Sequence, residues 1–138
     1  MYSLLSNAIN YPQKLILEDM ETVQIKRIYE PAEKEDGKRI LIDRLWPRGV
    51  KKESAGLDEW MKAVAPSVAL RKWFDHDPAK WETFSLQYTL ELKQNKAVND
   101  LIELVKHSGA VTLLYAAHDA QHNHALILQR FLTEALKK

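Results

Sequence analysis

The chain has 138 residues, enough for one domain, and its 46% hydrophobic and 28% charged residues are typical of a globular protein. It has no cysteine, which excludes disulfides, thiolate metal sites and a cysteine nucleophile, and its net charge of +1 excludes a general attraction to nucleic acid. No apolar run approaches the roughly 20 residues that span a bilayer. We therefore expect a cytoplasmic protein that contacts no membrane and has no bound cofactor, with nucleic acid not favoured as a partner.

Residues 1–20 differ from the rest of the chain and are predicted to be an N-terminal extension, with residues 21–138 as one domain. The extension is rich in aliphatic residues but lacks the positive stretch and the small-residue cleavage site of a signal peptide. Two interpretations stay open: an extension packed on the domain, or an upstream start that precedes an older beginning at Met20. In either case we expect the domain to fold without residues 1–19.

The first half of the domain is predicted to hold two strands and two short helices. Residues 22–29 and 39–45 carry the short apolar runs of strands, and a polar connection with Pro31 separates them. Apolar residues at helical spacing then predict a helix over 57–64 and a second one over 67–74.

The second half is predicted to hold three helices and a third strand. Asp77 followed by proline is a helix start, and this helix is expected to run to about residue 94. Its inward face is expected to carry one heavy stripe: Trp81, Phe84, Tyr88 and Leu92. A further helix covers 98–105, residues 110–117 read as a strand buried on both faces, and Asp119 is expected to cap the last helix.

The order of these elements predicts an α/β fold. The long helical connection between the second and third strands favours parallel pairing. We expect a small layered domain with a mainly parallel sheet of about three to four strands and helices packed on it. Parallel strands end at the same edge of a sheet, where ligands bind in open α/β folds. The loop over 43–49 is therefore expected near the turn over 115–124.

The loop after the second strand is the first candidate site. Arginine offers a planar fork of donors that matches carboxylate or phosphate, tryptophan forms a wall, and glycine lets a ligand approach the backbone. The candidate residues are Asp43, Arg44, Trp46, Arg48 and Gly49. The competing interpretation is structural: Asp43 pairs with an arginine to hold the loop, and Trp46 fills the core.

The turn after the third strand is the second candidate site. It contributes Tyr115, Asp119, Asn123 and His124. The exposed amides of a helix start attract anions, and His124 is suited to acid/base chemistry near neutral pH. If the domain is catalytic, His124 is the acid or base, and Asp43 orients an arginine or accepts a ligand hydroxyl. The alternative for His124 is a buried, hydrogen-bonded histidine.

Two further patterns are weaker. His118, His122 and His124 are metal-ligand types, but the last two are two positions apart and do not share a helical face, so we expect no metal site. Basic and aromatic residues alternate over 71–78, a pattern that can grip nucleic acid, but large aromatic residues favour a core role there.

Several blocks of the sequence resemble the bacterial YeaO-like family, a domain of unknown function. They are Arg39–Gly49 (RILIDRLWPRG), residues 57–60 (LDEW), 65–67 (APS), 70–71 (LR), 113–117 (LLYAA) and 123–125 (NHA). The resemblance covers residues 23–136 and implies a compact α/β domain with no established reaction. Longer relatives carry a cysteine and histidine motif in the region that matches 115–124. This chain has no cysteine, so thiol chemistry does not carry over.

Together these patterns predict that the chain binds an anionic or phosphate-bearing small molecule at the carboxyl edge of the sheet, with or without catalysis. Arg48 and His124 are expected to lie close enough to share this ligand. The alternative is a non-catalytic module that binds protein or nucleic acid through its arginine and tryptophan residues.

Overall fold

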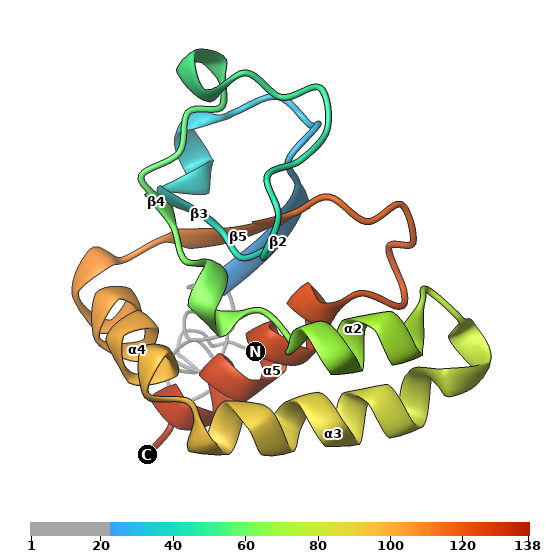
Figure 1. The fold of residues 1–138 in the computed structure, drawn as a ribbon. Coiled ribbons are helices and arrows are strands. Elements are labelled where there is room, and N and C mark those ends of the chain that lie inside the picture. Colours follow the sequence, from blue (N-terminus) through green and yellow to red (C-terminus); the bar gives the residue numbers. More distant parts are fainter. Residues whose placement is uncertain (1–22) are drawn as a thin grey trace, which may run out of the picture.

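The computed structural model describes residues 23–138, and Figure 1 shows its arrangement. The predictions about the N-terminal extension lie outside these residues. The strands of this part are β2 (Val23–Arg27), β3 (Lys38–Leu41), β4 (Glu59–Trp60) and β5 (Val111–Tyr115). They form one sheet in the order β2-β5-β3-β4, and every neighbouring pair is parallel. The predicted α/β class with a parallel sheet is confirmed.

The helices gather on one side of this sheet, as Figure 1 shows. They are α2 (Val68–Phe74), α3 (Trp81–Gln94), α4 (Lys96–Ser108) and α5 (His124–Leu136). Short 3-10 turns lie at Lys34–Asp36, Lys52–Ser54, Lys62–Val64 and Pro78–Lys80. None of the helices within residues 23–138 is long and apolar enough to cross a membrane.

The central strand β5 divides the core into two parts. All five of its residues are buried, and successive side chains point to opposite faces. Leu113 faces the helices and joins the main core, which includes the predicted stripe residues Phe84, Tyr88 and Leu92. Leu114 faces the other side, where it packs with Ile28 and Leu41. The sheet is therefore buried on both faces, as its continuous apolar run predicts.

Loops, rather than helices, cover the second face. The loop after β3 places Trp46 and Val50 against the smaller apolar cluster, together with Trp60 from β4. The rings of Trp46 and Trp60 meet edge to face, with centroids 5.2 Å apart. Trp46 donates its Nε1 proton to the carbonyl of Val50 over 2.7 Å, which fixes the loop locally.

A buried ion cluster occupies another part of the second face. Asp36 accepts hydrogen bonds from Lys26 Nζ at 3.1 Å and from the Arg39 guanidinium, and Arg39 also donates to the carbonyls of Gly56 and Ala55. Burial opposes ionisation of Asp36, but bonds from the Glu33 amide, Lys26 and Arg39 hold its pKa below the ordinary value. Each charge in the cluster thus has a protein partner.

Gly37 lets β3 start directly beside this ion cluster. Its φ is +64°, a left-handed conformation that favours glycine. A Cβ atom there would lie 2.2 Å from the carbonyl oxygen of Ala110, just before β5. The residue at this turn must therefore be glycine if the two strands are to approach each other.

Two predicted elements are wrong. The expected helix over 57–64 is instead the short strand β4 followed by a 3-10 turn. Trp60 pairs with Leu41 in the sheet, and its Nε1 donates to the carbonyl of Asp43 at 2.8 Å. These tertiary contacts outweigh the local preference for a helix that the spacing of apolar residues indicates.

The expected cap of the last helix is also wrong. Asp119 does not cap α5, because that helix starts five residues later and the Asn123 side chain accepts from the Leu126 amide. Asp119 instead accepts from the amides of Gln121 and His122 inside its own loop. Aspartate and asparagine are equally good N-cap residues, so the sequence alone does not decide whether Asp119 or Asn123 caps α5.

Candidate functional site

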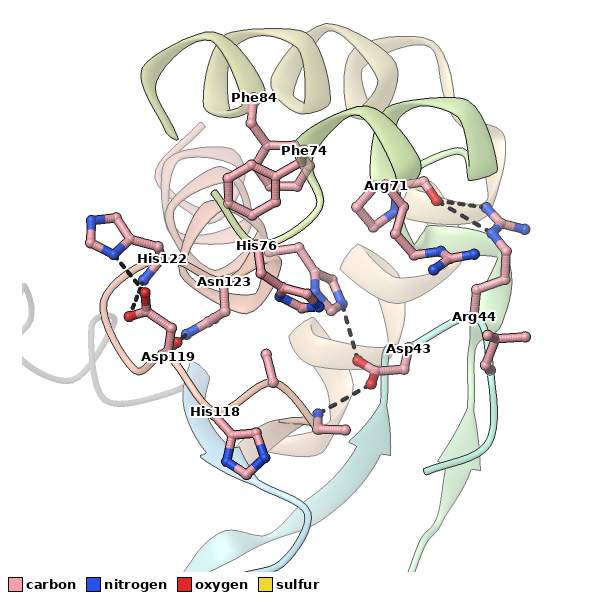
Figure 2. A pocket seen from close by; sticks show the side chains of 15 residues that line it. Asp43, Arg44, Arg71, Phe74, His76, Phe84, His118, Asp119, His122 and Asn123 are labelled. Carbon is pink, nitrogen blue, oxygen red and sulfur yellow. Dashed lines mark hydrogen bonds and ion pairs between the residues drawn. The ribbon is translucent and has the colours of Figure 1, made fainter. Parts of the chain in front are cut away.

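A cavity of about 500 Å³ opens at the carboxyl edge of the sheet. It lies among the loop after β3, the loop that joins β5 to α5, and the helices α2 and α3, as Figure 2 shows. The lining side chains are Asp43, Arg44, Leu45, Pro66, Arg71, Phe74, His76, Phe84, Ala116, Ala117, His118, Asp119, His122, Asn123 and His124. The cavity thus lies where ligands bind in open α/β folds.

Asp43 joins the two loops at the base of this cavity. Its Oδ2 accepts a hydrogen bond from the Ala116 amide at 3.1 Å, so the end of β3 is tied to the end of β5. Its Oδ1 is buried and has no hydrogen bond with the described residues, and it lies 3.3 Å from Nε2 of His124. One oxygen of this carboxylate is therefore structural, and the other faces the histidine.

His124 is the first residue of α5, and its ring reaches across to the end of β3. Its Nε2 lies 3.0 Å from the carbonyl oxygen of Ile42. A carbonyl only accepts, so this contact places a proton on Nε2. The ring also packs against Tyr88, with centroids 6.1 Å apart. His124 is thus a hydrogen-bonded histidine of the protein interior that also lines the cavity.

Two arginines line the cavity, and they differ in what holds them. Arg44 donates to the carbonyls of Ala65 and Pro66 over 3.1 to 3.3 Å, which ties the loop after β3 to the start of α2. The side chain of Arg71, exposed on α2, forms no hydrogen bond or ion pair with residues 23–138. Figure 2 shows this contrast: dashed lines hold Arg44 and none reaches Arg71. Arg71 is therefore the arginine with donors to spare.

Four of the five histidines of the chain line the cavity. His76 is the second of two consecutive left-handed residues, because Asp75 has a φ of 47° and His76 has a φ of 56°. Such a conformation costs a non-glycine residue about 1–2 kcal/mol. The turn that places an exposed imidazole at this cavity is consequently a strained one.

The loop between β5 and α5 is held by Asp119. His122 Nδ1 lies 2.8 Å from Asp119 Oδ2, and the other carboxylate oxygen accepts from backbone amides. The hydrogen bond from the Gln121 amide is the largest cause that lowers the pKa of Asp119, followed by the bond from His122. Asn123 donates to the carbonyl of Asp119, so the side chains of this loop are largely engaged with one another.

Four of the predicted site residues do not line the cavity. The side chains of the loop after β3 point to different sides of the sheet. Asp43 and Arg44 face the cavity, and Trp46, after Leu45, packs on the opposite face of the sheet. Arg48 is exposed and its carbonyl accepts from Tyr29, and Gly49 sits in a turn with a φ of +77°. Tyr115 is buried in the main core, where burial raises its pKa.

The structure adds residues that the predicted site lacks. Arg71 and His76 come from α2 and the turn after it, and they appeared in the sequence only as part of a basic and aromatic run. Leu45 lies within the predicted loop, but an exposed leucine carries no signal of its own there. Arg71 and His76 reach the site through the packing of α2, which the periodicity of the sequence does not reveal.

The lining of the cavity limits its chemistry. It includes no serine, threonine, tyrosine or lysine, and the chain has no cysteine. No group of three or more histidine, aspartate or glutamate side chains within residues 23–138 is placed to hold a metal ion. The described residues around the cavity thus offer imidazoles, guanidinium groups and carboxylates, and no hydroxyl, thiol or amine nucleophile.

Comparison with known proteins assigns the chain to a family. The model of a family described as "Inactive DUF488-N3 subclade" matches residues 22–138. The chain belongs to this subclade. It is 46% identical to the uncharacterized protein YeaO of Escherichia coli over 110 residues, which are 80% of this chain and 96% of YeaO. The predicted resemblance to the YeaO-like family is therefore confirmed.

Two mycobacterial proteins are less similar to the chain than YeaO is. The uncharacterized proteins Mb3100c of Mycobacterium bovis and Rv3073c of Mycobacterium tuberculosis are each 36% identical over 110 residues, 80% of this chain and 92% of theirs. No solved structure matches the chain. The description of the matching subclade as inactive agrees with a cavity lining that has no hydroxyl, thiol or amine side chain.

Proposed function

We propose that this protein binds an anionic or phosphate-bearing small molecule in the cavity at the carboxyl edge of its sheet, and that it does so without covalent chemistry. The observation that carries the proposal is Arg71, an exposed guanidinium at the cavity with no partner among the described residues. Its planar fork of donors matches a carboxylate or phosphate.

The surrounding charges support an anion rather than a cation. Both carboxylates of the lining accept from backbone amides: Asp119 from Gln121 and His122, and Asp43 through Oδ2 from Ala116. The other oxygen of Asp43 is buried and lies 3.3 Å from Nε2 of His124, so it faces the protein. Arg71 and the exposed imidazoles of His76 and His118, which form no hydrogen bond with the described residues, are the donors that remain for a ligand. The amino end of α5 adds the positive end of a helix dipole to this edge.

The absence of covalent chemistry is supported by the lining and by the family. Among the described residues no hydroxyl, thiol or amine faces the cavity, and the matching subclade is described as inactive. His124 donates its Nε2 proton to the carbonyl oxygen of Ile42, so a proton transfer through that nitrogen would break a structural hydrogen bond. Catalytic roles for His124 and Asp43 stay predictions, and binding explains their positions without them.

The alternative, nucleic-acid binding through the tryptophan face, is less well supported. The ammonium groups of Lys52 and Lys62 already lie over the rings of Trp46 and Trp60, at 5.5 and 4.6 Å. A base would have to displace both lysines in order to stack on these rings. The near-zero net charge of the chain adds no general attraction.

Sulfate titration tests the proposal, because sulfate keeps its charge across neutral pH. We expect the melting temperature of the wild type to rise with sulfate at constant ionic strength, by the equivalent of about 1.4 kcal/mol at ten times the dissociation constant. Arg71→Gln is expected to abolish most of this rise. Lys72→Gln and Arg48→Gln are matched controls, because both remove an exposed cation that does not line the cavity. Equal shifts in all four proteins would overturn the proposal.

A further inference from the structure

The cavity is much larger than an inorganic anion. Its volume is about 500 Å³, within the range of about 300–1,000 Å³ found for small-molecule sites. A tetrahedral oxyanion is only a few times larger than a water molecule, whose share of liquid volume is about 30 Å³. Inorganic phosphate at Arg71 would therefore leave most of the cavity to water, so the size favours an anion with an organic part.

The apolar part of the cavity lining indicates where that organic part would lie. Leu45 is 62% exposed and belongs to neither core cluster, although it lines the cavity beside Arg44. Further apolar lining comes from Pro66, Phe74, Phe84, Ala116 and Ala117. An exposed leucine on an apolar wall is hydrophobic surface that a bound ligand would cover and so remove from contact with water.

The shape of the wall favours a flat ring over an aliphatic chain. Phe74 and Phe84 stack on each other with centroids 4.0 Å apart and an angle of 12° between their planes. The exposed imidazole of His76 lies next to Phe74, with ring centroids 6.4 Å apart, and belongs to the strained turn of Asp75 and His76. Aromatic and histidine rings are the surfaces on which planar heterocycles stack.

Resting on the proposed function, we infer that the ligand is a phosphate monoester that carries an aromatic or heteroaromatic ring. Its phosphate binds at Arg71, and its ring lies against Leu45 and the aromatic wall formed by Phe74 and His76. The ring supplies the specificity, because the arginine alone accepts any anion of suitable shape.

Isothermal titration with four compounds tests this inference: inorganic phosphate, glycerol 3-phosphate, phenyl phosphate and adenosine monophosphate. We expect phenyl phosphate to bind at least ten-fold tighter than inorganic phosphate and glycerol 3-phosphate to bind about as weakly as inorganic phosphate. Adenosine monophosphate distinguishes a nucleotide ligand from a simple aryl phosphate. A nucleotide site is expected to bind it more tightly than phenyl phosphate, and an aryl phosphate site is not.

Two serine variants locate the ring. Leu45→Ser is expected to weaken phenyl phosphate about five-fold and to leave inorganic phosphate unchanged. Leu86→Ser is the matched control, because Leu86 is 61% exposed on α3 and does not line the cavity. Arg71→Gln is expected to weaken all four compounds.

The outcomes distinguish this inference from the function on which it rests. If phenyl phosphate binds no tighter than glycerol 3-phosphate, or if Leu45→Ser changes neither, the ring is overturned and the anion site stands. If no compound binds the wild type, both the ring and the anion site are overturned.

Discussion

Two polar clusters lie against the same sheet and use their charges in opposite ways. In the buried ion cluster of Lys26, Asp36 and Arg39, each charged group is paired with another part of the protein. In the cavity at the carboxyl edge, Arg71 has no partner among the described residues and Asp43 leaves one oxygen without a hydrogen bond. The paired charges hold the fold together, and the unpaired guanidinium of Arg71 is the group that we propose as the ligand contact.

Arg39 and Arg71 show that residue type does not separate these two uses. Arg39 is 6% exposed, and its guanidinium bonds to one carboxylate and two carbonyls. Arg71 is exposed on a helix and has no such bond. The difference predicts that removal of the first charge affects stability and removal of the second affects binding.

The largest expected effect is in the ion cluster. Asp36→Ala leaves the charges of Lys26 and Arg39 without their shared carboxylate, and breaking a buried pair in this way costs about 3–5 kcal/mol. Urea unfolding measures the loss. Glu33→Gln is the control, because the Glu33 side chain is 65% exposed and its pair with Lys26 is worth less than about 1 kcal/mol. A loss below 1 kcal/mol for Asp36→Ala would contradict a structural role for the cluster.

The pH dependence of stability sharpens the same comparison. The folded-state pKa of Asp36 is lowered, so its contribution is complete above the ordinary aspartate value of about 3.9 and is lost as pH falls through the lower folded value. The pKa of Lys26 is raised, chiefly by its hydrogen bond to Glu33, so its contribution is complete below the ordinary lysine value and is lost as pH rises through the higher folded one.

Unfolding curves of the wild type and Asp36→Asn across acid pH check the acid half of this expectation. The difference in unfolding free energy between the two proteins should shrink as the wild-type carboxylate takes up its proton. A difference that stays constant down to the lowest pH at which both fold would show that the charge of Asp36 contributes nothing.

A smaller effect is expected at the edge of the cavity. Asn123→Ala removes the cap of α5 and should cost about 1 kcal/mol, within the usual range of 0.5–2 kcal/mol. Asn123→Ser keeps a capping oxygen and should recover most of that loss. Thermal unfolding of the two variants makes the comparison, and equal stabilities would mean that the cap is not what this side chain contributes.

The smallest expected change in stability is at Arg71. Without ligand, Arg71→Gln should alter the free energy of unfolding by no more than about 0.5 kcal/mol, because the side chain has no partner to lose. The same urea titration that measures Asp36→Ala measures this variant. A loss as large as that of Asp36→Ala would place Arg71 among the structural arginines and remove the contrast between the two clusters.

The sequence predicted the sheet and the location of the cavity at its carboxyl edge better than it predicted which residues line that cavity. The apolar runs of β3 and β5 and the long helical connection between them were enough to predict parallel strands, and with them the approach of the loop over 43–49 to the turn over 115–124, where Asp43 lies 3.3 Å from His124. The expected pair of Arg48 and His124 does not share the cavity, because Arg48 is not part of its lining. The path of the backbone and the pairing of the strands follow from the pattern of hydrophobic residues in the sequence.

The remaining site residues depend on packing that the pattern does not contain. Trp46 and Arg44 are two positions apart, yet the loop turns between them so that the tryptophan seals the second face of the sheet. Arg71 reaches the cavity because α2 packs against α3 with Phe74 stacked on Phe84. Such choices between neighbouring residues are decided by tertiary contacts.

The strand order also has a consequence for how the chain acquires its structure. β5 comes last in sequence but lies between β2 and β3, so Val111 pairs with both Val23 and Lys38. During synthesis β2 and β3 leave the ribosome well before β5, which lies between them. Until β5 is made, the backbone edges that pair with it have no hydrogen-bond partner. Closing such long connections is entropically costly and slow. We therefore expect the sheet to assemble late, in one cooperative step, and a chain interrupted before residue 111 to be a target for chaperones and proteases rather than a partly folded domain.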